Sequence, residues 1–412
     1  MIVWNDFRND ARVLKEAETL QATGYIVTVH ALHTPGVTAE RETLSSGVRV
    51  IRMARSPLWR WRKRKGPSSV EAEHATIANT TPGPIGKMGL MHQVLRIFAR
   101  LWTHLGLMLQ IVRSHPHIVH SHDVNTLPTA WLASLLTRSP LVYDAHEIST
   151  DREGYTSFRS LVGWVEKHLM PRAVGTITTT DTRAKFFARA YGITRPLVLQ
   201  NRPRMTAIES SQRIREELQL DQPWPIVLYQ GGLQQGRGLE RLIDVAAQVE
   251  NAYFVFIGGG RLEIALKNHV QSLQLESRVH FIPTVSLQDL PYYTASADIG
   301  VQPIENTCLN HFSTDSNKLF EYVQGGLPIV ASNLPEIRRV INNHKLGILV
   351  PAGDSSALAA AINELVRDPV KRARFCCNAQ WAAKTLSWEA QEHELAILYR
   401  RIFTDKYHAS AL

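Results

Sequence analysis

The chain alternates short apolar, strand-like runs with helical patterns, and it does so twice. In the first half, runs such as Tyr25–His30, Leu141–Tyr143 and Gly175–Thr178 are separated by helical stretches such as Asp10–Gln21. Strands joined by helical crossovers run parallel within one sheet. The first half is therefore expected to form a parallel α/β domain, beginning with a short strand over Met1–Trp4.

A polar, proline-punctuated stretch over residues 201–223 interrupts this alternation, which resumes at Ile226–Tyr229 and turns purely helical after Asp354. We predict two doubly wound, Rossmann-like α/β domains that face one another across a cleft, with ligands at the carboxyl ends of the strands. The expected ranges are an N-terminal domain over 1–200, a linker over 201–223, a second domain over 224–385, and a C-terminal helix in 386–412 that returns to the first domain.

Composition excludes several classes of protein. A chain of 412 residues with 44% hydrophobic and 20% charged residues is neither disordered nor fibrous, and it is long enough for two cores. The segment Met1–Arg12 is interrupted by Asn5, Asp6, Arg8 and Asp10 where a signal peptide needs an apolar core, and no apolar run reaches the ~18 residues of a membrane span. Cys308 and the Cys376-Cys377 pair give no disulfide framework. We expect a cytoplasmic protein.

Positive charge is concentrated in the first half. Residues 1–200 contain 25 Lys and Arg against 15 Asp and Glu, whereas residues 201–412 contain 21 against 22. Such asymmetry indicates an anionic partner, which can be nucleic acid, a membrane surface or an acidic substrate, although a solvated basic face gives the same count. No helix-turn-helix, zinc finger or aromatic RNA-binding motif is present in the sequence, so nucleic acid is not expected.

A glycine-rich turn lies between a strand and a helix in the second half. It reads Tyr229-Gln-Gly-Gly-Leu-Gln-Gln-Gly-Arg-Gly238. Glycines let backbone N–H groups approach a phosphate, a helix N-terminus favours negative charge, and Arg237 adds a forked cation. The alternative is a tight turn that needs positive φ. A second turn, Gly258-Gly-Gly-Arg261, is interpreted as structural packing.

A second polar loop leads into a helix near Ser316-Asn317 that stops at Gly325-Gly326. Lys318 falls in its first turn, where a positive charge opposes the helix dipole unless an anion is bound. Glu321 follows one turn later, where a carboxylate suits the hydroxyl pair of a ribose. An ordinary surface Lys-Glu pair is the alternative interpretation.

These motifs together resemble family 4 glycosyltransferases with the GT-B fold. The runs that carry the resemblance are Asp298-Ile-Gly-Val-Gln-Pro303, Asn317-Lys-Leu-Phe-Glu-Tyr-Val-Gln-Gly-Gly-Leu-Pro-Ile-Val-Ala-Ser332, Asp10-Ala-Arg-Val-Leu-Lys-Glu-Ala17, Val119-His-Ser-His-Asp123 and Val142-Tyr-Asp-Ala-His-Glu147. The similarity covers nearly the whole chain, in the family's order.

The resemblance implies a donor site in the second domain. Arg237 would bind the donor pyrophosphate and Glu321 the donor ribose, and the expected donor-binding set is Gly231, Gly232, Arg237, Ser313, Asn317, Lys318 and Glu321. This chain departs from the family at two of these positions. Gly232 replaces an arginine, and Ser313 replaces the first glutamate of a paired-glutamate motif. We expect Lys318 to supply the missing cation.

The resemblance also implies a catalytic set in the first domain, namely Asp123, His146 and His122, with His146 near the donor sugar. The sequence shows no Ser-His-Asp set, metal cluster or paired catalytic carboxylates, so the chemistry is expected to rely on a nucleotide diphosphate leaving group. The donor would be a nucleotide-diphosphate sugar and the acceptor a glycan or a lipid-linked molecule, in cell-surface polysaccharide or glycolipid synthesis. Retention at the anomeric carbon and no cofactor are implied. Alternatives are a nucleotide-sugar 2-epimerase on the same fold and a non-catalytic lipid-binding protein.

Histidines cluster in the segment His115-Pro-His-Ile-Val-His-Ser-His122. On a strand, His120 and His122 project to one face, a spacing that can bind zinc. Two histidines without a clear third ligand make a poor metal site, so we expect no metal and favour packed or substrate-facing histidines.

A tryptophan-rich basic segment over Arg55–Lys65 precedes a long helix over Met88–Arg113. The residues expected to bind an anionic membrane are Trp59, Arg60, Trp61, Arg62, Lys63, Arg64 and Lys65. On the helix, a polar stripe of His92, Arg96, Arg100 and His104 leaves much of the remaining surface apolar. We predict peripheral attachment to the inner membrane face. A partner subunit, or a basic loop above an ordinary core helix, would explain the same pattern.

Overall fold

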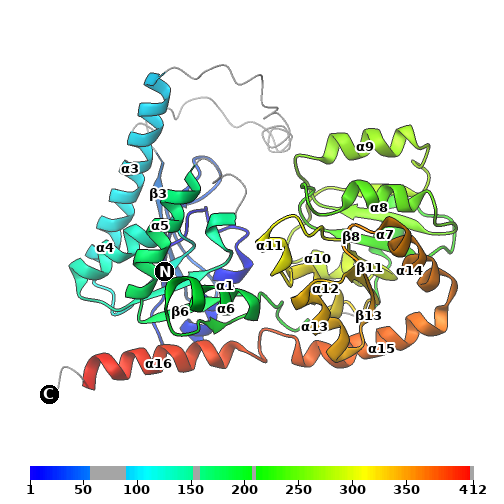
Figure 1. The fold of residues 1–412 in the computed structure, drawn as a ribbon. Coiled ribbons are helices and arrows are strands. Elements are labelled where there is room, and N and C mark those ends of the chain that lie inside the picture. The colour runs from blue at the N-terminus through cyan, green and yellow to red at the C-terminus, as the bar shows by residue number, and fades with distance from the viewer. Residues whose placement is uncertain (56–89, 152–157, 207–209, 409–412) are drawn as a thin grey trace. The chain divides into compact units, whose positions relative to one another are not determined.

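The computed structural model describes residues 1–55, 90–151, 158–206 and 210–408, and the side chains of residues 90–94, 96, 407 and 408 are not among those described. The chain divides into two compact units (Figure 1). The first unit contains Met1–His146, Ser160–Thr176 and Leu398–Leu412, and the second contains Glu147–Arg159 and Ile177–Ile397. The domain ranges expected from the sequence stay a prediction.

The N-terminal part of the chain builds two short sheets. One has the strand order β1-β3-β2 and the other β4-β5-β6-β7. The elements are α1 (Ala11–Ala22), β1 (Thr28–His33), β2 (Arg41–Thr43), β3 (Arg49–Ala54), α3 (Leu90–Arg113), β4 (Val119–His122), α4 (Leu127–Thr137), β5 (Leu141–Ala145), α5 (Arg159–Leu169), β6 (Gly175–Thr178), α6 (Asp181–Tyr191) and β7 (Leu197–Val198). β1 pairs in parallel with β3, and β4 with β5, as the alternation predicts. β2 pairs antiparallel with β3, which the sequence analysis did not foresee.

The strand expected over Met1–Trp4 is reduced to one bridging residue. Ile2 forms parallel bridges with His30 of β1 and with Ser121 of β4, so it connects the two sheets. Ile2 is completely buried, which explains why so short a segment holds its place. The helix that follows begins where expected, because the Asp10 side chain accepts a hydrogen bond from the Val13 N–H and caps α1.

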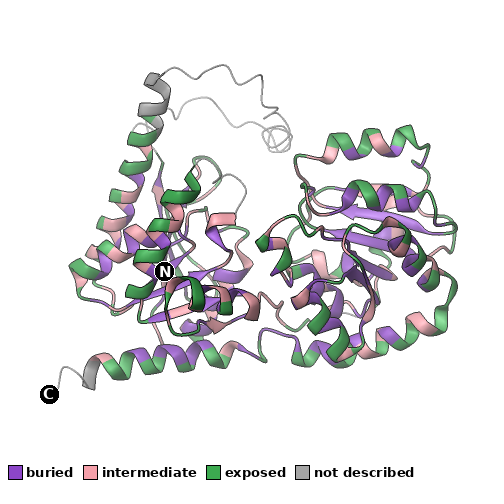
Figure 2. Ribbon diagram, viewed as in Figure 1, coloured by how far each residue is buried: buried purple, intermediate pink, exposed green. Residues whose placement is uncertain are grey.

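The second unit contains one six-stranded parallel sheet in the order β10-β9-β8-β11-β12-β13. Its elements are α7 (Arg213–Leu218), β8 (Ile226–Gln230), α8 (Leu239–Ala246), β9 (Tyr253–Ile257), α9 (Glu263–Ser272), β10 (Val279–Ile282), α10 (Leu290–Thr294), β11 (Ile299–Gln302), α11 (Leu309–Phe312), α12 (Asn317–Gln324), β12 (Ile329–Ser332), α13 (Pro335–His344), β13 (Gly347–Val350), α14 (Ser355–Arg367) and α15 (Pro369–Thr385). Apolar clusters pack on both faces of the sheet, so its strands are buried (Figure 2). From β8 the strands continue through β9 to β10 on one side and from β11 to β13 on the other, so the strand order reverses between β8 and β11. A Rossmann-like sheet binds ligands at such a switch point.

The purely helical C-terminal region is confirmed by α14, α15 and α16 (Glu392–His408). α16 contributes residues to both units, because the first unit includes Leu398–Leu412. Within the predicted linker, residues 213–218 form the short helix α7. None of the helices in the described part of the chain combines the length and apolarity needed to span a bilayer.

Candidate functional site

The glycine loop lies at the switch point of the second sheet, directly after β8. Gly231, Gly236 and Gly238 all have positive φ, which strains any residue with a Cβ. The second glycine turn packs against this loop, because a Cβ on Gly258 would lie 2.2 Å from the Gly231 carbonyl oxygen and one on Gly260 would lie 2.2 Å from that of Leu233. The packing role predicted for the second turn is confirmed.

Lys318 reaches the glycine loop from the first turn of α12. Its side chain is buried, its Nζ lies 5.0 Å from the centre of the Tyr229 ring, and its Nζ donates to Ser316 Oγ over 3.3 Å. A Cβ on Gly231 would lie 3.4 Å from this Nζ. Burial first, and then repulsion from Arg237, lower the pKa of Lys318 to about 7, and Glu321 partly opposes the shift. The lysine is thus placed beside the loop, where we expected a replacement cation.

Arg237 is half-buried in the same loop. Among the described residues, its guanidinium has no hydrogen-bond or ion-pair partner. The first turn of α12 is also without a side-chain cap, because Ser316 occupies the N-cap position and makes no capping hydrogen bond. Uncapped N–H groups and an unpaired guanidinium favour a bound anion.

Glu321 is oriented by a polar pair that the sequence analysis missed. Glu321 Oε2 accepts a 2.6 Å hydrogen bond from Gln230 Nε2, and Gln230 Oε1 accepts one of 2.9 Å from Thr294. Gln230 is the last residue of β8 and is buried. The sequence signal for Gln230 was a polar residue at the last position of an otherwise apolar strand. Gln302 ends β11 in the same way.

Ser313 does not offer its hydroxyl to a ligand, contrary to expectation. It is buried, its Oγ donates to the Leu309 carbonyl over 2.7 Å, and it accepts from Arg183 Nε over 3.1 Å. Its role is therefore internal, linking the loop to α6. Asn317, by contrast, is exposed at the start of α12, and Gly231 and Gly232 are exposed in the glycine loop.

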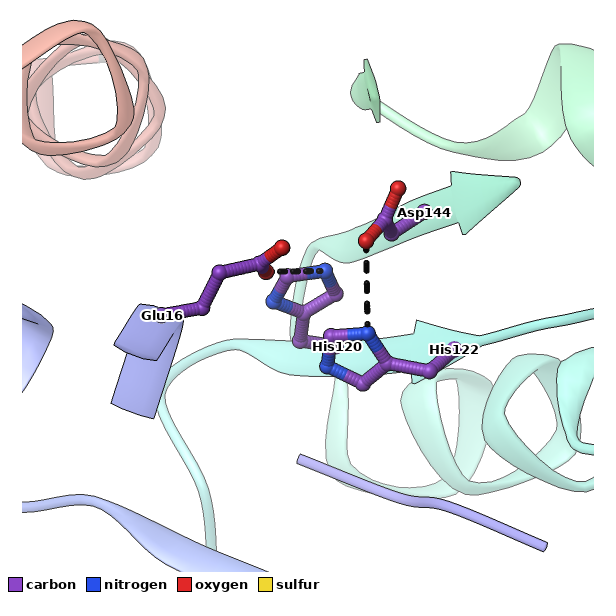
Figure 3. A group of neighbouring side chains, drawn as sticks. All are labelled: Glu16, His120, His122 and Asp144. Carbon is purple, nitrogen blue, oxygen red and sulfur yellow. Dashed lines mark ion pairs between the residues drawn. The ribbon is translucent and has the colours of Figure 1, made fainter. Parts of the chain in front are cut away.

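The first unit contains a second polar cluster, centred on Asp144 at the end of β5 (Figure 3). Arg12 of α1 donates to both oxygens of this carboxylate, over 2.7 Å from Nε and 2.9 Å from Nη2. His146 Nε2 lies 3.0 Å from Asp144 Oδ2, and His122 Nδ1 lies 3.4 Å from the same oxygen. Although burial alone would raise it, Arg12 and His146 hold the pKa of Asp144 well below its usual range.

The three residues expected to be catalytic meet beside this carboxylate, but they are not equally accessible. His146 and Asp123 have side chains 20% and 23% exposed, with His146 Nδ1 3.8 Å from Asp123 Oδ2. His122 is only 2% exposed and its Nδ1 lies 3.3 Å from His146 Nε2, so of the two alternatives it is the packed one, and its catalytic role stays a prediction. Asp123 follows β4 with φ +62°, a left-handed conformation that few residues adopt.

His146 carries a positive charge over the ordinary pH range. Burial opposes the charged form, but Asp123 and Asp144 raise the pKa of His146 to about 9. An imidazolium with one N–H directed to the buried Asp144 can present its other edge to Asp123 or to a ligand oxygen. Such a group can hold a hydroxyl and stabilise developing negative charge.

The same cluster has the donor atoms of a metal site. Glu16, His120, His122 and Asp144 are buried and offer ligand atoms within 4.8 Å of one another, so the third and fourth ligands that the sequence lacked come from α1 and β5. Arg12, however, already occupies both oxygens of Asp144 and lies 3.2 Å from Glu16 Oε1. A dication there would be a close neighbour of a guanidinium in a buried site, where repulsion costs several kcal/mol. The arrangement fits a guanidinium better than a metal ion.

The segment Trp59–Lys65, which we expect to bind a membrane, lies outside the described residues. The following helix, α3, is described from Leu95 onward except for Arg96, and buries Thr103, Leu107 and Ile111. Its exposed apolar side chains are Leu95, Ile97, Phe98, Leu101, Trp102, Leu105 and Leu109. The second apolar face expected from the sequence is confirmed. Of the polar stripe, Arg100 is exposed, whereas His104 is half-buried, stacks on Trp4 and hydrogen-bonds Thr129.

Two sequence families match the chain. Residues 10–202 match the family described as Glycosyl transferase 4-like domain, and residues 210–381 match Glycosyl transferases group 1. The chain is a family 4 glycosyltransferase. Both halves of the resemblance found in the motifs are thereby confirmed.

Relatives of this family 4 glycosyltransferase are transferases of several sugars. It is 25% identical to a phosphatidyl-myo-inositol mannosyltransferase from Mycobacterium leprae, over 70% of this chain and 74% of that protein. It is 26% identical to an alpha-D-kanosaminyltransferase from Streptomyces kanamyceticus, over 76% of this chain and 82% of that protein. The activity class is therefore glycosyl transfer.

Solved structures confirm the GT-B fold of the glycosyltransferase. Sucrose-phosphate synthase from Thermosynechococcus elongatus aligns with a TM-score of 0.76 at 19% identity, covering 98% of this chain and 99% of that one. Anabaena HepE in complex with UDP-glucose aligns with a TM-score of 0.71 at 18% identity, covering 97% and 98%. At these identities the likeness concerns the fold.

Proposed function

We propose that this glycosyltransferase uses a nucleotide-diphosphate sugar as its donor. The observation that carries the proposal is Arg237, which has no ion-pair partner within the described part of the chain, beside the buried Lys318, both at a glycine loop that follows β8. Two cations and an uncapped helix start suit the two charged groups of a diphosphate. The complex of Anabaena HepE with UDP-glucose shows that a protein of this fold binds such a donor.

Glu321 is proposed to hold the ribose of the donor. Its Oε2 is fixed by Gln230 over 2.6 Å, which leaves the carboxylate oriented rather than mobile. A fixed carboxylate accepts two hydrogen bonds from vicinal hydroxyls at little entropic cost. Ser313 replaces the first glutamate of the family's paired-glutamate motif, and its hydroxyl bonds to Leu309 and Arg183 within the protein. Groups other than residue 313 therefore have to bind the hydroxyls of the donor sugar.

The experiment is a calorimetric titration of the intact protein with nucleoside diphosphates and with a panel of nucleotide sugars. Arg237→Gln should weaken binding of the diphosphate by about tenfold or more, since a charge-assisted contact is lost. Arg241→Gln is the matched control, because Arg241 is an exposed arginine that already pairs with Glu305 over 2.9 Å. Equal affinities in the wild type and both variants would remove the donor assignment.

The first unit is proposed to act on the transferred sugar and on the acceptor through His146 and Asp123. An imidazolium held between two carboxylates donates to a hydroxyl, while Asp123 accepts from one. With a nucleoside diphosphate as leaving group, neither residue has to serve as a nucleophile. Retention at the anomeric carbon, independence of metal ions and a glycan or lipid-linked acceptor complete the proposal.

We further propose that the enzyme attaches to an anionic membrane surface through α3 and the basic segment before it. Leu95, Phe98, Trp102, Leu105 and Leu109 recur every three or four residues and are all exposed. Arg100 is exposed on the same helix, and Arg60 to Lys65 precede it in the sequence. An apolar stripe next to cations is the pattern of an interfacial helix rather than of a subunit interface. Attachment there would give access to a lipid-linked acceptor in cell-surface glycan synthesis.

A further inference from the structure

The cluster around Asp144 pairs its two buried carboxyls unequally. Asp144 and Glu16 are both 0% exposed, and a single guanidinium, that of Arg12, contacts them. Both oxygens of Asp144 accept hydrogen bonds from Arg12, whereas neither oxygen of Glu16 has a hydrogen-bond partner among the residues that the structure describes. A buried carboxylate that receives no hydrogen bond is costly as an anion, because nothing replaces its lost hydration.

The neighbours of Glu16 do not change this balance. His120 Nε2 lies 3.9 Å from Glu16 Oε2, too far for a hydrogen bond, and its Nδ1 bonds instead with the Tyr399 hydroxyl over 2.8 Å. His120 stacks on His122, with ring centres 4.2 Å apart. Both rings are buried, and burial lowers the pKa of each, so neither supplies a positive charge.

We propose that Glu16 is held as a neutral carboxylic acid that donates to Asp144 and, together with Arg12, acts as a positioning residue for His146. The two buried carboxyls thereby divide their roles, with Asp144 carrying the charge and Glu16 carrying the proton. Burial and the charge of Asp144 raise the pKa of Glu16 well above its ordinary range, in agreement with this division. The inference rests on the proposed role of His146 in glycosyl transfer.

The chemical consequence is a fixed orientation for the His146 ring. Asp144 accepts hydrogen bonds from the Arg12 guanidinium on both oxygens, and His146 Nε2 lies 3.0 Å from it. The proposed hydrogen bond from the Glu16 carboxylic acid would join these contacts, since the two carboxyls offer oxygen atoms within 4.8 Å of one another. A carboxylate held by donors on several sides cannot rotate, so the ring it anchors keeps its other nitrogen directed toward Asp123. Arg12, Glu16, His122 and Asp144 are the buried groups that set the charge of His146, and Asp123 is the partly exposed one.

Infrared spectroscopy tests the protonation of Glu16 directly. The difference spectrum between the wild type and Glu16→Gln, near neutral pH, should contain the C=O stretch of a buried carboxylic acid that is lost in the variant. A difference spectrum with only carboxylate bands would overturn the proposal. Glu18→Gln, on the same helix but partly exposed, is the matched control and should lose carboxylate bands.

Kinetics test the positioning role. Glu16→Gln keeps a neutral donor of the same size and should retain kcat within about threefold, whereas Glu16→Ala should lose about tenfold in kcat with the donor KM unchanged. Asp144→Asn should lose about 100-fold, and it should lower the NMR titration midpoint of His146, which Glu16→Gln leaves in place. A Gln variant as impaired as the Ala variant would show that Glu16 acts as an anion and would overturn the proposal.

The catalytic role proposed for His146 and the positioning role proposed for Glu16 can be overturned separately. If His146→Gln turns over like the wild type, the catalytic role proposed for His146 is wrong, whatever the infrared spectrum shows. If His146→Gln is impaired while Glu16→Ala has the kcat and the His146 midpoint of the wild type, the proposed function stands and the positioning role of Glu16 is overturned.

Discussion

The two polar sites of the molecule differ in how far their charged side chains are paired within the protein. In the second unit, Arg237 has no ion-pair partner among the described residues and Lys318 is buried beside the glycine loop with only a serine to bond. In the first unit, Arg12, Asp144 and His146 already satisfy one another. The comparison indicates that the second site is arranged to receive charge from a ligand, and that the first is arranged to fix the orientation of a few groups before any ligand arrives.

Substitutions should therefore have different consequences in the two sites. Breaking a saturated cluster leaves a buried charge uncompensated and costs folding stability. Removing a cation that pairs only with the ligand lowers the affinity for that ligand and leaves the folding stability unchanged. It can even raise the stability, because repulsion between neighbouring cations is removed. The predictions below test this distinction.

The largest effect is expected for Arg12→Ala. It leaves the Asp144 carboxylate buried without its guanidinium, and the free energy of unfolding should fall by about 3 to 5 kcal/mol. Denaturant unfolding measures this loss. Arg8→Ala is the control, since Arg8 pairs with Asp6 at the surface with its side chain 42% exposed, and it should cost well under about 1 kcal/mol. Similar losses in both variants would contradict the saturated-cluster interpretation.

Arg237→Ala and Glu321→Ala should each reduce kcat/KM by about 30-fold, equivalent to about 2 kcal/mol of lost charge-assisted contact. The unfolding curve of Arg237→Ala should match that of the wild type, whereas Glu321→Ala should cost about 1 to 2 kcal/mol, because it removes the hydrogen-bond partner of the buried Gln230 side chain. Initial-rate kinetics and unfolding are measured on the same preparations. A loss of stability comparable with that of Arg12→Ala would erase the contrast between the two sites.

The lowered pKa of Lys318 predicts that donor binding depends on pH. With a pKa lowered to about 7, the lysine is largely neutral above that pH in the unliganded protein, and a diphosphate favours its charged form. Binding then requires proton uptake, so affinity for a nucleoside diphosphate should fall as pH rises from about 7 to 9, by at most about tenfold per pH unit. Lys318→Arg, which stays protonated, should flatten the profile. A wild-type profile that is already flat would show that Lys318 does not meet the diphosphate.

The smallest expected effect is the loss of membrane binding when exposed apolar residues of α3 are replaced. Replacing Phe98, Leu101 and Trp102 together with Ser should reduce cosedimentation with anionic vesicles by about tenfold, with no change in stability, since all three are exposed. Salt should weaken the residual binding. Trp381→Ser, an 82% exposed tryptophan on α15, is the control and should bind vesicles like the wild type. Equal loss in the control would show that any exposed tryptophan suffices.

The sequence predicted which residues of the proposed donor site lie close together, because the parts of that site are local. The glycine loop, Lys318 and Glu321 each follow or open an element whose pattern is visible in the chain, and a parallel sheet gathers strand ends at one edge. Gln230 was missed because a polar residue at the end of a strand is also common at the surface. Ser313 was misjudged because its partner, Arg183, lies on α6, far away in the sequence.

The first unit's cluster was only half predictable. His122, Asp123 and His146 were singled out because they end neighbouring strands, whereas Arg12 and Glu16 entered only as members of the run Asp10–Ala17 that carries the resemblance and were given no role of their own. Both are buried, in line with Leu20 at a spacing of four, which was the signal available. Their partner Asp144 is joined to them only by tertiary packing, and no local pattern encodes that contact.

The most direct test of the division between the sites is to measure nucleoside-diphosphate affinity and turnover on the same two variants, His146→Ala and Arg237→Ala. His146→Ala should bind the nucleoside diphosphate like the wild type, within about threefold, while its kcat falls by about 100-fold. Arg237→Ala should lose at least about tenfold in affinity. A His146→Ala protein with weakened diphosphate affinity and normal turnover would contradict the account.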